Sequence, residues 1–591
     1  MIDFASPFVL LDDARPQGAG PARLYARPVR VVEAHGSDEA AGCFEQLRQA
    51  AAAGLHAAGF MAYEFGYCLE ARLAGLHRPG EADGPPLLWF GLFESCRSIP
   101  GAEMMALLPD PAGAFATRPR PLIERAEYDA ALARVQEHIA AGDLYQANLT
   151  FQAEVRVAGS PAALYAAIRG RAAAGHGGLA FTGRDWLLSF SPELFFTLED
   201  GRVTTRPMKG TAARGPTPEA DRAAVVSLLA DPKQRAENLM IVDLLRNDLS
   251  RVARPGTVQV PALFEAETYP TLHQMTSTVT ARLEEGVDPV RLIEAIFPCG
   301  SITGAPKIRA MELLAGLEAE PRGAYTGALG WIGPEGDAAF NVAIRTLTMR
   351  AGDGRARIGL GSGIVADSEV GDEWRECLAK GAFVQDRRRF DLIETMRFDP
   401  HTGIAELDRH LARMKASAEA LGFAFDRHDA RNELQAATFR LREPRKLRLM
   451  LARSGAIAIE TRPLPPTPAE PVSVALAALP VAADDFRLRH KTSDRDFYDE
   501  ARRAGGCFET LFHDADGFLT EGSFTSLFVE RDGVLITPPL ARGLIPGVLR
   551  ARLIEDGEAR EGDLVAGDLA GGFFLGNAAR GLIEAELRPG G

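Results

Sequence analysis

Helical and extended segments alternate along this 591-residue chain without the regular strand–helix–strand rhythm that builds a parallel sheet. The Ala-rich stretch FEQLRQAAAAGLHAAGF is typical of a helix, and PPLLWFGLFES further on is typical of a strand between turns. Alternating strands follow in GLAFTGRDWLLSFSPELFF. Helices mixed with antiparallel strands predict an α+β fold, with a large antiparallel-sheet domain first.

Two domains are expected. A helix in DEWRECLAKGAFVQDRRR closes the first part, and FDLIETMRFDPHTGIAELDRHLARM starts a new pattern of strand, hairpin, strand and helix. We therefore predict one domain over 1–388 and a second over 389–591. The Pro-rich connector TRPLPPTPAEP divides the second domain into lobes at about 389–465 and 472–591.

Composition excludes several classes of function. The 66 basic and 80 acidic residues give a net charge of 66 − 80 = −14, which disfavours binding to nucleic acid or to an anionic membrane. No apolar run reaches the ~18 residues of a membrane-spanning helix, and the N-terminus lacks the basic region of a signal peptide. The six cysteines form no CxxC pair, so reduced thiols and a cytoplasmic protein are expected.

Lysine is scarce, and this draws attention to each one. Only seven of the 66 basic residues are lysine. Arginine keeps its proton, so it cannot act as an amine nucleophile, whereas a lysine can. We expect Lys415 and Lys446 to be ordinary surface residues and treat the others as candidates for chemistry.

Charged residues of the first domain suggest a site for a polycarboxylate. Glu373 and Glu376 are three residues apart on a predicted helix, and Glu237 lies in a helix that Asp231 can cap, so the three could bind Mg²⁺. Glutamates at this spacing also occur on solvated helix faces. We expect Arg345 to lie inside the otherwise apolar strand FNVAIRTLTM, where it needs an anionic partner, and GLGSGIVADS offers free backbone N–H groups.

Residues of the second domain suggest pyridoxal phosphate. Lys491 is followed thirty residues later by Glu521, which opens a turn of small residues before a strand. A lysine, a lone acid and a phosphate cradle together favour this cofactor. The cradle would consist of a basic residue, a tight turn and a helix start, at Arg413, Asn577 and Gly547, Val548 and Leu549.

The first domain resembles the chorismate-utilising enzymes, which include anthranilate, isochorismate and salicylate synthases and the synthase component of aminodeoxychorismate synthase. The resemblance rests on AGDLYQANLTFQ, SFSPELFF, TRPMKGTAARG, AENLMIVDLLRNDLSRV, FPCGSITGAPKIRAMELL, YTGALGWI and GSGIVADSEVGDEWRECLAK. It implies that Glu237, Glu373 and Glu376 hold Mg²⁺ against the ring carboxylate of chorismate. It places His273 near the departing ring hydroxyl. The substrate-binding residues that it implies are Gln146, Thr211, Tyr325, Arg345, Gly361, Ser362, Gly363 and Lys380.

Two positions separate the members of this family. Isochorismate-forming relatives carry a water-activating lysine where this chain has Gln146, and anthranilate synthases carry alanine where it has Lys209. Lys209 resembles the nucleophile of aminodeoxychorismate synthase, which expels the 4-hydroxyl and is then displaced by ammonia. Glu193 matches the acid/base partner of that step.

The second domain resembles the fold-type IV pyridoxal-phosphate enzymes, which include branched-chain aminotransferases and 4-amino-4-deoxychorismate lyases. By this resemblance Lys491 bonds covalently to the cofactor and Glu521 keeps its pyridine nitrogen protonated. Arg413, Asn577 and the backbone from Gly547 to Leu549 hold the phosphate. LIETMR places Thr395 near the substrate. These motifs are common to lyases and aminotransferases.

Together the resemblances imply a bifunctional enzyme of 4-aminobenzoate synthesis in the folate pathway. Chorismate and ammonia would give 4-amino-4-deoxychorismate, and the second domain would eliminate pyruvate from it. The chain has no GxCxG-like string for a glutaminase nucleophile, so a separate glutamine amidotransferase subunit is expected, together with a homodimer formed through the second domain. The alternatives are an aminotransferase second domain, an anthranilate synthase-like first domain, and one half that is an inactive scaffold.

Overall fold

The computed structural model describes residues 2–76, 84–269 and 272–588, which pack into two compact units. The first unit consists of the described residues within Met1–Pro109, Arg118–Val155 and Tyr165–Gln385. The second consists of those within Asp110–Thr117, Arg156–Leu164 and Asp386–Gly591.

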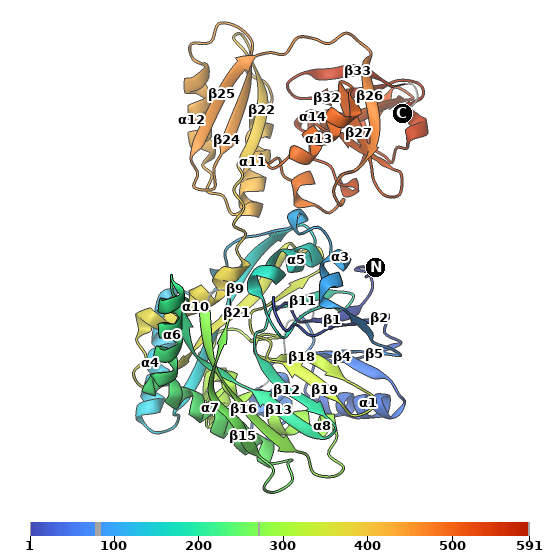
Figure 1. The fold of residues 1–591 in the computed structure, drawn as a ribbon. Helices are drawn as coiled ribbons and strands as arrows, with labels where there is room; N and C mark the ends of the chain where they lie inside the picture. The colour runs from blue at the N-terminus through green and yellow to red at the C-terminus, as the bar shows by residue number, and fades with distance from the viewer. Residues whose placement is uncertain (1, 77–83, 270–271, 589–591) are drawn as a thin grey trace. The chain divides into compact units, whose positions relative to one another are not determined.

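Two large sheets form the first unit, and their strands pair antiparallel (Figure 1). The path of one sheet is β17 (Gly304–Ala305), β9 (Gln146–Ala158), β21 (Arg355–Ile364), β20 (Thr346–Arg350), β11 (Asp185–Ser189), β10 (Gly177–Phe181), β1 (Phe8–Asp12), β2 (Ala22–Ala26) and β6 (Arg97–Ile99), with β8 (Arg120–Pro121) beside β9. Strand β7 (Phe115–Ala116) pairs with the end of β9, at Val157 and Ala158, and both of these pieces belong to the second unit. The path of the other is β14 (Met208–Ala213), β16 (Leu272–Arg282), β13 (Arg202–Arg206), β12 (Leu194–Glu199), β19 (Ala338–Asn341), β18 (Ala328–Ile332), β4 (His56–Met61), β5 (Leu88–Phe93) and β3 (Arg30–Ala34), with β15 (Gln259–Thr268) beside β16.

An apolar core joins the two sheets. Val9 and Leu187 of one sheet pack with Phe60, Trp89 and Leu329 of the other, and all five side chains are buried. Burying one such side chain contributes about 1.5–3 kcal/mol. The helices are α1 (Ala40–Ala52), α2 (Phe65–Cys68), α3 (Met104–Leu107), α4 (Arg125–Ala140), α5 (Pro161–Ala172), α6 (Pro218–Ala230), α7 (Pro232–Ser250), α8 (Pro289–Ile296), α9 (Lys307–Leu317) and α10 (Val370–Gly381).

Helix α7 begins where the sequence predicts. The Asp231 carboxylate accepts hydrogen bonds from the backbone N–H groups of Lys233 and Gln234, and Pro232 occupies the first turn. The helix packs against β14 and β16, which places its side chains beside those two strands.

The second unit contains two lobes, each built on its own sheet. The first sheet is β23 (Gly403–Ile404), β22 (Leu392–Asp399), β24 (Arg445–Leu451) and β25 (Ile457–Pro463), packed against α11 (Leu407–Leu421) and α12 (Arg427–Thr438). The second is β28 (Leu519–Gly522), β27 (Glu509–His513), β26 (Val472–Ala478), β33 (Gly581–Leu587), β32 (Phe573–Asn577), β29 (Ser526–Arg531), β30 (Val534–Thr537) and β31 (Ala559–Glu561), packed against α13 (Asp496–Gly505) and α14 (Val548–Glu555). Strand β26 is parallel to both of its neighbours, and β30 is parallel to β31.

The predicted α+β class, with antiparallel sheets, is confirmed by these elements. The predicted boundaries 1–388 and 389–591 stay a prediction, and the packing differs from them in one respect. Two short pieces of the first predicted domain, 110–117 and 156–164, pack with the second unit because Phe115 is buried in that unit's core.

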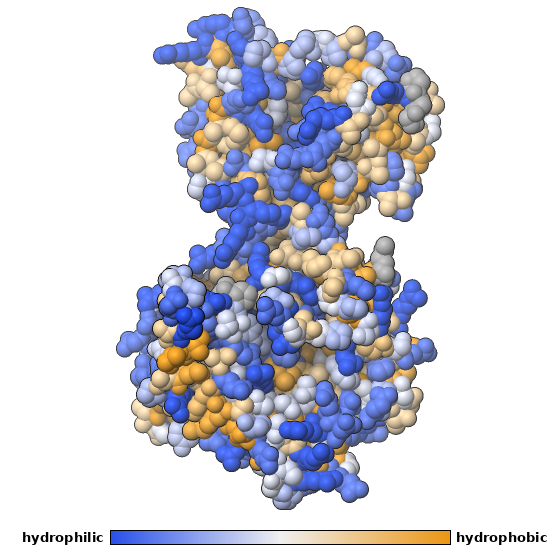
Figure 2. All heavy atoms as spheres, in the orientation of Figure 1, coloured by the Kyte–Doolittle hydropathy of each residue, from blue (hydrophilic) through white to orange (hydrophobic). Residues whose placement is uncertain are grey.

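Hydrophilic side chains cover most of the face shown in Figure 2, in keeping with the many charged residues. Exposed apolar side chains gather over α6, α7 and β15, where Val226, Leu239 and Leu263 are 67%, 43% and 42% exposed. None of the described helices is long and apolar enough to cross a bilayer. All six cysteines are free.

Two candidate active sites

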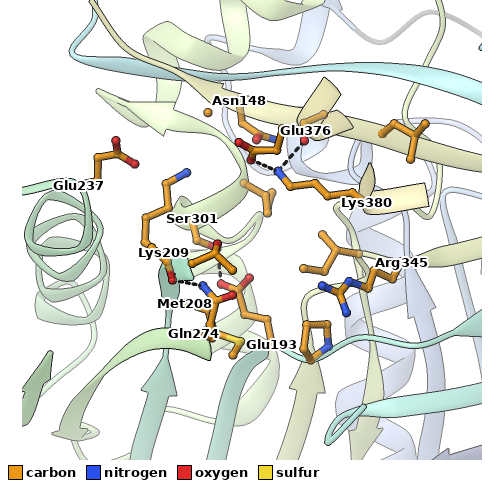
Figure 3. Close-up of a pocket in the computed structure, with 18 of the residues that line it drawn as sticks. Asn148, Glu193, Met208, Lys209, Glu237, Gln274, Ser301, Arg345, Glu376 and Lys380 are labelled. Atoms are coloured by element: carbon orange, nitrogen blue, oxygen red, sulfur yellow. Dashed lines mark hydrogen bonds and ion pairs between the residues drawn. The ribbon is translucent and has the colours of Figure 1, made fainter. Parts of the chain in front are cut away.

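Each unit contains one large cavity. The cavity of the first unit, about 530 Å³, lies between strands of both sheets and helices α7 and α10 (Figure 3). Eleven of the residues predicted for this site line it: Glu193, Lys209, Thr211, Glu237, Tyr325, Arg345, Gly361, Gly363, Glu373, Glu376 and Lys380.

Lys209 extends from β14 into this cavity, where it is half-buried. Burial lowers the pKa of its amine, and the nearby charge of Lys380 lowers it further. The amine lies close to the backbone of Gly363, because a Cβ built on that residue would lie only 2.5 Å from Lys209 Nζ. The same Cβ would lie 3.0 Å from Gln146 Nε2, so the amine and this amide converge on one point.

Glu193 is a buried acid in the same cavity. The Ser301 hydroxyl donates a hydrogen bond of 2.7 Å to Glu193 Oε1. Burial raises the pKa of this carboxyl to about 7, so at neutral pH a large share of Glu193 is protonated. A carboxyl that is largely protonated and an amine of lowered pKa in one cavity are groups that can act as an acid and a nucleophile.

Cationic groups of the cavity can take up anions. Arg345 lies just before β20 rather than inside a strand, with φ at +50°, and burial lowers the pKa of its guanidinium. No carboxylate among the described residues forms an ion pair with it. Lys380 Nζ lies 2.7 Å from Glu376 Oε1 and donates a hydrogen bond of 2.9 Å to the Gly361 carbonyl.

The three glutamates proposed for Mg²⁺ line the cavity but hold no preformed ligand cage. Ser368 Oγ donates a hydrogen bond of 2.7 Å to Glu373, while Glu376 pairs with Lys380. Burial raises the pKa of Glu237; for Glu376 the effect of burial is outweighed by Lys380, and its pKa is lowered. Within the part of the chain that the structure describes, no three His, Cys, Asp or Glu side chains lie close enough to hold a metal ion. The donor types nevertheless suit a hard ion.

Three predicted residues do not line the cavity. On β16 the neighbours Leu272 and Gln274 face it, so His273 points to the other side of the strand, where its ring nitrogens contact Asp221 and Thr268 at 2.9 Å. This geometry does not support the predicted position of His273 near the departing hydroxyl.

The side chain of Ser362 likewise points away, and its hydroxyl lies 3.2 Å from that of Tyr128. Gln146 is 1% exposed, and neither of its amide atoms has a hydrogen-bond partner. Because this amide lies beside the space over Gly363, it is available to a ligand.

Sequence reasoning missed several residues of this site. Asn148, Gln274 and Ser301 line the cavity, and Arg322 lies behind it. The Arg322 guanidinium donates hydrogen bonds to the carbonyls of Asn148 and Ile302 at 2.7 and 2.9 Å, which joins two lining segments. Strand alternation around residue 273 could have revealed Gln274, whereas the link made by Arg322 depends on tertiary packing.

The cavity of the second unit, about 460 Å³, lies between its two lobes and is lined by every residue predicted for it. These are Thr395, Arg413, Lys491, Glu521, Gly547, Val548, Leu549 and Asn577. Burial, and then the charge of Arg413, lower the pKa of Lys491 to about 7. Its amine is therefore neutral in much of the protein at neutral pH.

Glu521 is the buried acid of the second cavity. Burial raises its pKa to about 7, and the Tyr498 hydroxyl donates a hydrogen bond of 2.6 Å to Glu521 Oε1. A ring nitrogen of a ligand could share this proton. Tyr498 gave no signal in the sequence, because an aromatic residue on an amphipathic helix is normally part of the core.

The residues predicted to hold a phosphate lie together in this cavity, and their role stays a prediction. Arg413 makes two hydrogen bonds to Glu394, at 2.6 and 2.8 Å, and donates a third to the Pro546 carbonyl at 2.9 Å. Next to that carbonyl, Gly547 precedes the first turn of α14, and a Cβ on it would lie 2.6 Å from Ser526 Oγ. Free N–H groups at a helix start beside a guanidinium suit a phosphate. Asn577 closes the neighbouring turn by accepting from the N–H groups of Ala579 and Arg580 at 3.0 Å.

Comparison with known proteins identifies two families, one in each part of the chain. Residues 6–386 match the family described as chorismate binding enzyme, and residues 391–586 match amino-transferase class IV. An aminodeoxychorismate synthase of Streptomyces griseus is 44% identical over 248 residues, which is 42% of this chain and 34% of that protein. Anthranilate synthase component 1 of Streptomyces coelicolor is 42% identical over 259 residues, 44% of this chain and 50% of that protein.

The chain thus spans between a third and a half of the length of these relatives. A solved structure of anthranilate synthase component I from Streptococcus pneumoniae matches with a TM-score of 0.53 and 23% identity, over 65% of this chain and 94% of that one. This likeness shows a shared fold for the first unit.

Replacing Glu193 should change how stability depends on pH. A carboxyl whose pKa is raised on folding stabilises the protein fully below its unfolded pKa of 4.5, and this contribution is lost as pH rises through 7. We predict that the unsubstituted protein loses on the order of 2 kcal/mol more than Glu193→Gln between pH 5 and pH 8 in urea unfolding. Glu199→Gln, at the exposed end of β12, the strand that follows Glu193, should behave like the unsubstituted protein. Equal losses in all three proteins would contradict the assignment.

Proposed function

This chain belongs to the chorismate-binding enzyme family and carries a class IV aminotransferase region, and from that premise we propose a two-step enzyme of 4-aminobenzoate synthesis. The first unit converts chorismate and ammonia to 4-amino-4-deoxychorismate. The second releases pyruvate from that product and leaves 4-aminobenzoate. The observation that carries this proposal is that each unit has a cavity lined by a lysine whose pKa is lowered by burial and by a buried acid, Glu193 or Glu521, whose pKa is raised by burial.

In the first step Lys209 is the proposed nucleophile. Its neutral amine adds to the ring, the bond to the 4-hydroxyl breaks, and Glu193 supplies the proton with which that group leaves as water. Ammonia then forms the new C–N bond and displaces Lys209. Glu193, deprotonated in the preceding step, can take up the proton that the nitrogen loses. Arg345 and Lys380 hold the substrate carboxylates. Gln146 is a neutral amide and a poor base for water, so the incoming nucleophile is an amine.

Mg²⁺ is proposed as the metal of this cavity. The oxygen donors Glu237, Glu373 and Glu376 would hold it, and bound there it would neutralise charge on the substrate's ring carboxylate. The raised pKa of Glu237 fits this role, because a nearby cation would relieve the cost of an ionised, buried carboxylate.

Pyridoxal phosphate is proposed as the cofactor of the second cavity, and its residues fit the group. Arg413, Asn577 and the start of α14 would hold the phosphate, while Glu521 would face the ring nitrogen. When bound, the cofactor supplies an electron sink for a carbanion. Lys491, once its nitrogen is free, is placed to remove the proton from the amine-bearing ring carbon, and the C–O bond on the neighbouring ring carbon then breaks. Loss of pyruvate then makes the ring aromatic, which makes the second step effectively irreversible and favours a lyase over an aminotransferase.

A separate glutamine amidotransferase subunit is proposed as the source of ammonia. We also propose a homodimer formed through the second unit, because fold-type IV relatives build their sites at a dimer interface.

The two lysines should separate the two steps. We predict that Lys209→Ala lowers ammonium-dependent chorismate consumption at least about 10²-fold, because the nucleophile is lost. Lys491→Ala should leave that consumption unchanged and stop 4-aminobenzoate formation. Chorismate loss and product identity can be followed by chromatography and mass spectrometry.

Lys415→Ala, with a side chain that is 59% exposed, is the matched control and should retain both steps. Loss of both steps in Lys491→Ala would contradict the two-site proposal. An α-keto acid-dependent exchange of amino groups, in place of pyruvate release, would identify the second unit as an aminotransferase.

Removing a proposed metal ligand should raise the Mg²⁺ requirement. We predict that Glu237→Gln and Glu376→Gln weaken apparent Mg²⁺ affinity at least about tenfold, measured by titrating Mg²⁺ into the chorismate consumption assay after treatment with EDTA. Glu199→Gln serves again as the control. An unchanged Mg²⁺ midpoint in both variants would place the metal elsewhere.

A further inference from the structure

An aromatic cluster of the second unit takes one of its rings from a distant part of the sequence. Phe115 is fully buried, and its ring centroid lies 5.6 Å from that of Phe390 and 5.7 Å from that of Phe486. Phe390 and Phe486 are themselves 5.8 Å apart. Three rings from three separate segments thus pack together at distances typical of favourable aromatic pairs.

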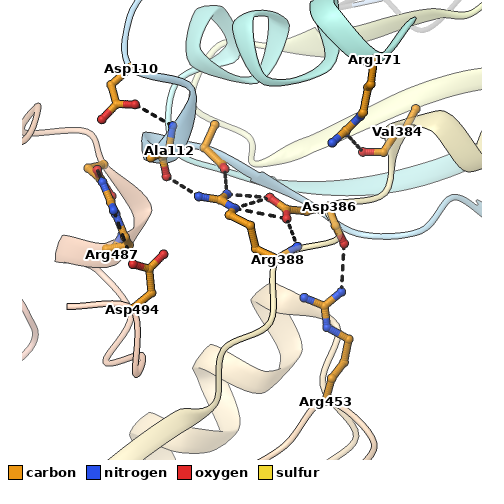
Figure 4. Close-up of polar contacts among 11 residues, drawn as sticks. Asp110, Ala112, Arg171, Val384, Asp386, Arg388, Arg453, Arg487 and Asp494 are labelled. Atoms are coloured by element: carbon orange, nitrogen blue, oxygen red, sulfur yellow. Dashed lines mark hydrogen bonds and ion pairs between the residues drawn. The ribbon is translucent and has the colours of Figure 1, made fainter. Parts of the chain in front are cut away.

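Polar contacts hold residues 110–117, here called the 110–117 segment, in the second unit (Figure 4). Arg388 donates hydrogen bonds to the carbonyls of Ala112, at 2.7 Å, and Ala114, and it also pairs with Asp386. The backbone N–H of Asp386 donates to the Ala116 carbonyl at 3.0 Å. These bonds satisfy backbone groups that would otherwise be buried without partners, so the segment is built into this unit.

A guanidinium covers the aromatic cluster. Arg453 lies over the rings of Phe115, Phe390 and Phe423 at 5.1, 5.9 and 5.4 Å, and one of its N–H groups donates to the Asp386 carbonyl at 3.3 Å. Cation–π contacts of this kind favour a single arrangement of the rings. Removing the ring of Phe115 would therefore leave a cavity between Phe390, Phe486 and the guanidinium of Arg453.

Two of the three rings belong to the segments that fix the backbone of Lys491. Shortly after Phe390, the N–H of Ile393 donates a hydrogen bond of 2.9 Å to the Lys491 carbonyl. The N–H of Ser493 donates to the Asp391 carbonyl at 2.8 Å, so residues 491–493 run alongside the start of β22. A displacement of Phe390 would move this pairing.

Phe486 approaches Lys491 from the other direction along the chain. Its carbonyl accepts a hydrogen bond of 3.0 Å from the N–H of His490, the residue before Lys491. The preceding Asp485 binds Arg487 through two nitrogens, at 3.0 and 2.6 Å. A Cβ on Gly113 would lie 3.3 Å from Asp485 Oδ2, so the 110–117 segment also rests against this turn.

We propose that Phe115 is a positioning residue for Lys491. Through Phe390 and Phe486 it fixes the two backbone segments between which Lys491 is held, so the amine projects into the cavity and is kept from water. A chain that lacks the 110–117 segment therefore has an incomplete second site, although every residue that lines that cavity is still present.

The environment of the Lys491 amine makes this proposal measurable. The charged and titratable groups that face it come from four places in the fold: Glu394 on β22, His410 and Arg413 on α11, Arg495 before α13 and Glu521 on β28. Burial is the largest influence on its pKa of about 7. Water admitted by a loosened backbone would move that pKa up toward the ordinary value of 10.5.

The test measures the reactivity of Lys491 in the full chain without cofactor, and so it does not rest on the proposed function. Acetic anhydride, which acylates only neutral amines, is applied from pH 5 to pH 10, and labelling of Lys491 is followed by mass spectrometry. The expected result for Phe115→Ala is a midpoint raised by one pH unit or more. At pH 7 such a rise lowers the neutral fraction of the amine about fivefold.

Matched variants separate positioning from a general loss of stability. Phe573→Ala removes an equally buried ring from a different core of the same unit and should leave the midpoint unchanged. Phe115→Leu should shift it less than Phe115→Ala, and Arg388→Gln, which loosens the 110–117 segment from outside, should shift it in the same direction.

If Phe115→Ala does not fold, Phe115→Leu and Arg388→Gln decide the question in the same assay. An unchanged Lys491 midpoint in these variants, or an equal shift in Phe573→Ala, would overturn the proposal. In all variants, ammonium-dependent chorismate consumption should stay at the level of the unsubstituted protein, because the first cavity contains none of these residues.

Discussion

Removal of two amines from water is the constraint on which both sites depend. An ammonium group inside a low-dielectric cavity loses its hydration, so burial favours the neutral form of Lys209 and Lys491. The same burial acts in the opposite sense on the acids beside them and raises the pKa of Glu193 and Glu521 to about 7. One physical cause thus gives each cavity an amine and an acid with the protonation states that the proposed steps require.

The two units fix their amines by different means. Lys209 lies on β14 where the register with β16 shifts, between Met208 and Thr211, and these two flanking residues pair with Thr276 and Gln274 of β16. Lys491 lies in irregular backbone, which hydrogen bonds from β22 hold in place. Irregular backbone needs packing from several directions to stay fixed, and for Lys491 we propose that the buried ring of Phe115 supplies part of that packing.

The sequence predicted the parts of this account that depend on local pattern or residue chemistry. The scarcity of lysine directed attention to Lys209 and Lys491, and the Asp231–Pro232 signal fixed the start of α7. The prediction that His273 faces the cavity did not take strand alternation into account. On β16 Leu272 and Gln274 face the cavity, so His273 points to the other side.

Tertiary packing explains the remaining differences. The partnerless amide of Gln146 depends on which segments meet around it, and no local pattern in the sequence encodes that meeting. The membership of Phe115 in the second unit depends on contacts more than 270 residues apart in the chain (390 − 115 = 275). Arg345 was expected inside a strand; the structure places it just before β20 with a left-handed backbone, a conformation that an apolar run does not signal.

The most direct test of the central claim is product identification after incubation of the unsubstituted protein with chorismate, ammonium and Mg²⁺, with and without pyridoxal phosphate. Without the cofactor, the account predicts that chorismate gains an amino group in place of a hydroxyl and that no pyruvate appears. With the cofactor, 4-aminobenzoate and pyruvate should form in equal amounts. The account would be contradicted if 2-aminobenzoate formed, or if any aromatic amine formed at the same rate with and without pyridoxal phosphate.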